Sequence, residues 1–165
     1  QDITLVGRIT RTADVARRLT DDMRAQLAAL TGQLAGATAR PRVYWELDAT
    51  DPAKPYTVGP GSFVDELITL AGGANVFGQG DNPYPQVSAE QVVAADPQVI
   101  LLANAQYGVT VESVAQRPGW GGLAAVREGR VYPVDADLTT RPGPRIVAGI
   151  ESIARLLHPE LFAQG

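Results

Sequence analysis

Apolar residues recur at intervals of three and four positions in the first part of the chain. The members of this stripe are Ala16, Leu19, Met23, Leu27, Leu30 and Leu34. Because one helical turn takes about 3.6 residues, the stripe covers a single face of an α-helix. The pattern predicts a helix from Thr12 to about Ala35, roughly 36 Å long. Such a helix is either an ordinary surface helix or a spine that joins two lobes.

The pattern changes after Pro41 to short apolar runs that alternate with helical periods. Strands are expected over residues 43–47, 98–103 and 131–134, and helices over residues 62–71, 88–95, 111–116 and 145–157. Ser62 and Ser88 stand at two helix starts, and Gln91 completes a capping box with Ser88. This order predicts a three-layer α/β/α fold with a small, mainly parallel sheet, preceded by the long helix.

Composition places the chain among globular proteins, because 45% of its 165 residues are hydrophobic and 19% are charged. The net charge is −4 and no block of Lys and Arg exists, which argues against nucleic acid as a partner. There is no cysteine, so disulfides and thiolate chemistry are excluded. No apolar run approaches the ~20 residues of a membrane span.

Three motifs that could carry chemistry are weak. Residues 58–63, VGPGSF, open a helix, but the third glycine of a dinucleotide fingerprint and the Lys-Ser/Thr pair of a P-loop are missing. His158 is the only histidine, so nothing completes a transition-metal site. Asp135 and Asp137 could bind a cation or exchange protons, and a solvated loop explains them equally well. We therefore predict no catalytic residue, no metal ligand and no cofactor.

A group of aromatic residues falls in Pro- and Gly-rich segments outside the expected strands and helices. Its members are Tyr56, Tyr84, Tyr107 and Trp120. Loops that follow the strands of an open α/β sheet gather at one edge, where ligands bind. Aromatic side chains there would form a stacking surface for a large planar or bulky ligand. The alternative is that each ring covers the local core.

Three stretches together resemble a known family. They are FVDELITLAGGANVFG (63–78), NPYPQVSAEQVVAADPQVILL (82–102) and RPGPRIVAGIESIARLLHPE (141–160). Their combination of a Gly-Gly helix end, a Pro-aromatic-Pro turn, Ser-x-Glu, and Asp-Pro before an apolar strand is similar to one lobe of a transport protein. That lobe is the C-terminal one of the class III, helical-backbone solute-binding proteins, which serve bacterial ABC importers of cobalamin, haem and ferric siderophores.

The resemblance implies how the chain is organised. In this family one rigid helix joins two α/β lobes, and the ligand binds in the cleft between them. Residues 1–38 would be the interlobe backbone helix with its lead-in, and residues 39–165 the C-terminal lobe. The N-terminal lobe would be missing from a mature or trimmed chain. The family also implies a periplasmic or other extracytoplasmic location, and leaves open a lipoprotein anchor in an N-terminal segment outside this sequence.

The resemblance assigns Glu90 to docking, since each lobe in the family offers an exposed Glu that pairs with arginines of the membrane permease. A plain first-turn Glu, stabilised by the helix dipole, would have the same sequence. Only the family context separates the two interpretations.

The resemblance also assigns ligand contacts. Tyr84 matches the cleft aromatic between two prolines, and Tyr56 stands where another cleft aromatic is expected. Either tyrosine could also bind haem iron. Three further residues are expected in loops on the cleft side, namely Tyr107, Arg141 and Arg145. An arginine there would suit an acidic group of the ligand.

Two other functions stay open beside the transport reading, which predicts no enzymatic activity. One is an enzyme of related two-lobed fold that acts on a tetrapyrrole or a metal chelate. The other is a stand-alone sensor or interaction domain, in which apolar surface on the long helix would be buried in a dimer.

Overall fold

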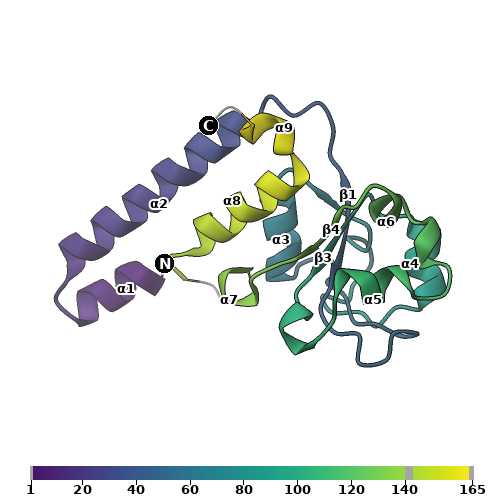
Figure 1. Cartoon of the computed structure of the whole chain (residues 1–165). Helices are drawn as coiled ribbons and strands as arrows, with labels where there is room; N and C mark the ends of the chain where they lie inside the picture. The colour runs from purple at the N-terminus through teal and green to yellow at the C-terminus, as the bar shows by residue number, and fades with distance from the viewer. Residues whose placement is uncertain (1, 140–142, 164–165) are drawn as a thin grey trace.

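A parallel sheet organises the structure, a computed structural model that describes residues 2–139 and 143–163 (Figure 1). Its strands are β1 (Arg42–Glu46), β2 (Ala74–Asn75), β3 (Val99–Leu102) and β4 (Val131–Pro133). They lie in the order β2-β1-β3-β4, and every neighbouring pair is parallel. Val43 is in register with Asn75 on one side and with Val99 on the other. The predicted parallel sheet is therefore confirmed.

Helices cover both faces of this sheet, which gives the three predicted layers (Figure 1). On one face lie α3 (Phe63–Leu70), α7 (Ala136–Thr139) and α8 (Ile146–Leu157), and on the other lie α4 (Ala89–Ala95), α5 (Val111–Ala115) and α6 (Ala124–Arg127). The remaining helices are α1 (Asp2–Ile9), α2 (Ala13–Leu34), α9 (Pro159–Phe162) and the 3-10 turns η1 (Ala105–Tyr107) and η2 (Trp120–Gly122).

Strand residues divide between two cores because successive side chains point to opposite faces of a sheet. Val43 and Trp45 belong to the core under α3 and α8. Tyr44 belongs to the core under α4, α5 and α6. The continuous apolar run of β3, with every residue buried, is typical of a parallel strand covered on both sides.

Helix α2 follows the predicted stripe closely. It starts one residue after Thr12 and ends one residue before Ala35, and its 22 residues span roughly 33 Å. Ala16 and Leu30 of the stripe are buried, and its other members are partly buried. Figure 1 shows the C-terminal half of α2 beside α8 and its N-terminal half beside α1, away from the sheet.

The predicted helix starts are confirmed at atomic detail. The Ser62 hydroxyl accepts a hydrogen bond from the Asp65 N–H at 3.2 Å. Ser88 and Gln91 form the reciprocal capping box, with distances of 3.2 Å and 2.7 Å. The short elements α1, β2, α6, α7 and α9 were not predicted, because runs of two to eight residues carry too little periodicity.

Candidate functional site

The carboxyl ends of the four strands meet at one edge of the sheet because the strands are parallel. The loops after β1, β2 and β3 cover residues 47–62, 76–88 and 103–110. Figure 1 shows the segments that follow β1, β3 and β4 along the lower side of the view. In open α/β sheets ligands bind outside this edge, so the predicted ligand residues are best judged by their place along it.

The structure brings Tyr56 and Tyr84 onto adjacent segments of this edge. Thr57 donates its N–H to the Pro85 carbonyl at 3.0 Å, and Gly59 donates to the Pro83 carbonyl at 2.9 Å. These bonds join the loop after β1 to the loop after β2. Tyr56 keeps 45% of its surface exposed and Tyr84 keeps 50%. Both rings are therefore available to a ligand.

Gly59 makes this loop pairing possible. A Cβ atom at this position would lie 2.1 Å from the carbonyl oxygen of Asn82, a distance that no side chain tolerates. The turn of residues 58–63 therefore needs a glycine at position 59, because the two loops approach each other closely there. Ser62 then caps α3, so both features of the motif have a structural use in the loop and the helix start.

Two of the three other predicted ligand residues lie in described segments. Tyr107 ends η1, directly after β3, and is 81% exposed. Arg145 immediately precedes α8 and is exposed. Arg141 lies outside the described residues. Tyr107 and Arg145 stay predictions as ligand contacts.

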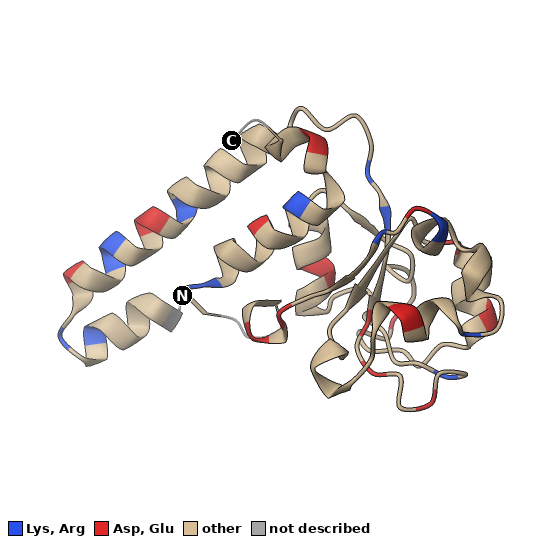
Figure 2. Ribbon diagram, in the orientation of Figure 1, with Lys and Arg blue, Asp and Glu red and all other residues tan. Residues whose placement is uncertain are grey.

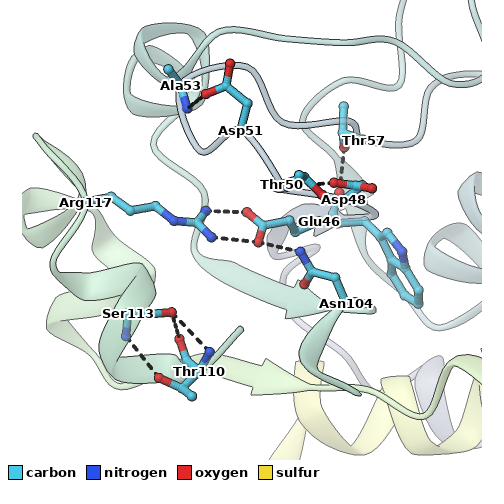
Figure 3. Close-up of polar contacts among 11 residues, drawn as sticks. Glu46, Asp48, Thr50, Asp51, Ala53, Thr57, Asn104, Thr110, Ser113 and Arg117 are labelled. Carbon is cyan, nitrogen blue, oxygen red and sulfur yellow. Dashed lines mark hydrogen bonds and ion pairs between the residues drawn. The ribbon is translucent and has the colours of Figure 1, made fainter. Parts of the chain in front are cut away.

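A buried ion pair that the sequence analysis did not predict lies under this edge (Figure 3). The Arg117 guanidinium forms a bidentate ion pair with Glu46, the last residue of β1. Its Nη1 donates to Oε2, and its Nη2 donates to Oε1 at 2.9 Å. The Asn104 amide also donates to Oε1 of Glu46, at 3.0 Å. The side chain of Glu46 is fully buried and that of Arg117 is 8% exposed.

This network fixes two of the edge loops. Asn104 begins the turn that leads to Tyr107, since the Tyr107 N–H donates to the Asn104 carbonyl at 2.9 Å. Arg117 lies between α5 and η2, so Glu46 links both segments to the end of β1. A signal for it existed, because a Glu that ends an otherwise apolar strand needs a buried partner.

For Trp120 the alternative interpretation holds, because its ring covers the local core. The ring is fully buried, packs edge-on against Tyr44 at 5.8 Å between ring centroids, and lies 4.6 Å below the Arg117 guanidinium. Its Pro- and Gly-rich context hid a 3-10 turn that points the indole inward. Burial raises the pKa of Tyr44 well above its usual value, Glu46 raises it further, and Arg117 opposes both.

Glu90 lies in the first turn of α4 and is exposed. The Ser88 hydroxyl, and after it the N–H of Glu90 itself, lowers the pKa of the Glu90 carboxyl. The group is therefore an ionised, accessible carboxylate at neutral pH. Its role as a docking residue stays a prediction.

His158 and the Asp135–Asp137 pair have structural contacts. His158 is buried, between α8 and α9, with Nε2 3.3 Å from the Gly72 carbonyl oxygen. Asp135 accepts the Asp137 N–H at 2.8 Å at the start of α7. Within residues 2–139 and 143–163, no group of three or more His, Cys, Asp or Glu side chains could hold a metal ion. No helix in those ranges is long and apolar enough to cross a membrane.

Comparison with known proteins decides the family. A model of the periplasmic binding protein family matches residues 1–138. The chain belongs to the periplasmic binding protein family. The resemblance to class III binding proteins is thus confirmed, and its relatives are substrate-binding proteins of ABC transporters and binding proteins for vitamin B12 and haem.

Two curated relatives illustrate the likeness. A cobalamin-binding protein of Halobacterium salinarum is 31% identical over 164 residues, which cover 93% of this chain and 42% of the relative. A vitamin B12-binding protein of Vibrio cholerae is 30% identical over 162 residues, covering 94% of this chain and 54% of the relative. The chain therefore spans about half the length of these curated relatives.

A solved structure shows the same fold. The periplasmic haem-binding protein BhuT, in complex with two haems, superposes with a TM-score of 0.83 at 28% identity. The match covers 96% of this chain and 61% of BhuT. The predicted α/β fold with a small parallel sheet is the fold of this family.

Proposed function

We propose that the chain is the C-terminal lobe, with its interlobe helix, of the solute-binding component of a bacterial ABC importer. The cargo is cobalamin, haem or a ferric siderophore, held between this lobe and an N-terminal lobe. The protein works outside the cytoplasm, is not an enzyme, and delivers its cargo to a membrane permease. A lipoprotein anchor on the complete protein would be consistent with the relative from Bacillus subtilis that is described as a lipoprotein.

The observation that carries the proposal is the pair of exposed rings, Tyr56 and Tyr84, on loops joined by backbone hydrogen bonds at the carboxyl edge. Two exposed aromatic rings on paired loops suit a large, flat or bulky cargo such as a tetrapyrrole. One relative is named as a vitamin B12-binding protein and another as a haem-binding protein, which supports the same class of cargo here.

Titration of the complete protein with cobalamin, haemin and ferric siderophores tests the proposal. We expect tight one-to-one binding of one cargo class by absorbance and calorimetry. The isolated 165-residue chain should bind the same cargo several orders of magnitude more weakly, because half the cleft wall is absent. Failure of the complete protein to bind any of the three classes would contradict the proposal.

Two substitutions at each tyrosine separate stacking from iron binding. Tyr56→Ala and Tyr84→Ala remove the ring and should each weaken binding roughly tenfold. The matched changes Tyr56→Phe and Tyr84→Phe keep the ring and remove the hydroxyl. If one Phe variant alone loses affinity for haemin and changes its absorbance spectrum, that tyrosine is an iron ligand.

Docking is assigned to Glu90. Its carboxylate is exposed and rigidly placed by the Ser88–Gln91 capping box, and can accept a bidentate arginine from a permease. Glu90→Ala in the complete protein should lower uptake and leave cargo affinity unchanged. Lost cargo affinity would instead place Glu90 in the ligand site.

A further inference from the structure

A hollow of about 420 Å³ opens beside Glu90. Its walls come from three separate segments: the loop after β1, helix α4, and the turn between α5 and η2. The side chains that line it include Ala53, Ala89, Val93, Ala94, Pro118 and Trp120. We call this hollow the α4 socket. Apart from Glu90 at its rim and Arg117 in its wall, these lining groups are apolar or glycine.

The socket is held in shape before any partner arrives. The Ala89 N–H donates to the Ala53 carbonyl at 3.0 Å and ties the loop to α4. The wall formed by Arg117 and Trp120 is fixed by the Arg117–Glu46 ion pair and by the stacking of Arg117 over the indole ring. A preformed concave surface lowers the entropic cost of binding. The socket is therefore preorganised to receive a partner.

The charges around the socket are mostly negative. Arg117 is neutralised by Glu46, which leaves Glu90 as the charged group of the rim. The loop that supplies Ala53 also carries the exposed carboxylates of Asp48 and Asp51, against one exposed ammonium, Lys54. Figure 2 shows these red segments on the loop that follows β1, at the lower right of the view. An apolar socket with an acidic rim complements a segment that is both apolar and basic.

We infer that the α4 socket is the apolar half of the docking site, and that the permease segment inserts an apolar side chain there beside the arginine that pairs with Glu90. This inference rests on the proposed function and adds the chemistry of the partner. We assign the socket to the permease and not to the cargo because it contains Glu90 and the exposed Ala94 of α4, and neither Tyr56 nor Tyr84 lines it.

The test uses the complete binding protein and its cognate permease with ATPase subunits in proteoliposomes. ATPase stimulation is measured against binding-protein concentration, at low and high salt. Ala94→Phe fills the socket without removing a hydrogen bond or a charge. Glu90→Gln removes the charge and keeps the shape. Ala29→Phe, an equal change at an exposed position of α2, is the matched control.

We expect Ala94→Phe to raise the half-saturating concentration roughly tenfold while the salt dependence of stimulation is retained. Glu90→Gln should raise it as well and flatten the salt dependence, because the screened charge pair is gone. The Ala29→Phe control should behave as wild type, and all three variants should bind cargo normally.

Three outcomes would overturn the inference. Wild-type saturation by Ala94→Phe would show that the socket takes no part in docking, while the proposed function would stand. Reduced cargo affinity in Ala94→Phe would make the socket part of the cargo site. Light scattering that finds a wild-type dimer and an Ala94→Phe monomer would make a second copy the occupant. A wild-type protein that binds cargo of no tested class and fails to stimulate the permease would overturn the proposed function as well.

Discussion

Arg117 and Arg155 make the same pair of interactions on opposite sides of the sheet. Each guanidinium lies 4.6 Å from the centroid of an aromatic ring, Trp120 for one and Phe162 for the other, and each pairs with a glutamate. The Arg117–Glu46 side chains are 8% and 0% exposed, whereas those of Arg155–Glu151 are 54% and 45% exposed. A list of contacts would treat the two arginines as equivalents.

Burial makes the two pairs physically different. Water solvates either partner of an exposed pair when the other is removed, so such a pair contributes little to stability. A buried carboxylate that loses its arginine has no such replacement and keeps the full cost of desolvation. Both faces of the sheet have an apolar core, and the face that carries α4, α5 and α6 also contains this buried polar network.

The largest expected effect is on the buried pair. Arg117→Ala should lower the free energy of unfolding by about 3–5 kcal/mol, because Glu46 is left buried and unpaired. Arg155→Ala, the matched change at the exposed pair, should cost about 0–1 kcal/mol. Urea unfolding of both variants measures the difference. Equal losses would mean that burial does not separate the two sites.

A smaller effect is expected from a change in the apolar core under α8. Ile153 is fully buried in the core under α8, and Ile153→Val removes one methylene from it. The free energy of unfolding should fall by about 0.5–1.5 kcal/mol, well below the loss in Arg117→Ala. Urea unfolding of Ile153→Val and wild type measures this loss of free energy. A loss as large as that of Arg117→Ala would show that tight apolar packing, rather than the ion pair, dominates stability.

The smallest effect at neutral pH is expected at Tyr44, whose hydroxyl is buried beside Glu46. Because the pKa of Tyr44 is raised in the folded state, the unfolded chain releases this proton first as pH rises past about 10. The unfolded state then binds fewer protons, so stability falls with rising pH. Tyr44→Phe should change stability little at neutral pH and reduce this alkaline loss.

The check is the urea midpoint of wild type and Tyr44→Phe, measured from about pH 8 to about pH 11, which brackets the titration of a free tyrosine. The two curves should separate only in the alkaline range. Parallel curves throughout would mean that Tyr44 does not link proton binding to folding.

Local signals predicted a large part of this structure. The apolar stripe predicted both ends of α2 to within one residue, and Ser88 with Gln91 predicted the start of α4. Both signals depend on residues that are close together along the chain. The apolar run of β3 predicted a strand covered on both faces for the same reason. Several short motifs carried the resemblance to the family, and the match of residues 1–138 to the family model confirmed it.

The features that were missed depend on distant residues. Glu46 and Arg117 are 71 positions apart, so no local pattern pairs them, and β2 is a strand only because Val43 lies beside Asn75. The sequence left open whether Trp120 faces a ligand or the core, because its burial follows from contacts with Tyr44 and Arg117. The Tyr56 and Tyr84 loops were each expected at the edge, and their direct pairing was not.

By itself the sequence determined the helices with clear periods and the parallel α/β class, since these follow from local spacing and composition, and its motifs carried the resemblance to the family. Only the tertiary structure decided which polar groups are buried together, which aromatic rings stay exposed, and that a hollow forms beside Glu90. Those properties arise where segments far apart in the chain meet, and the free energy of each group depends on the water that those segments exclude.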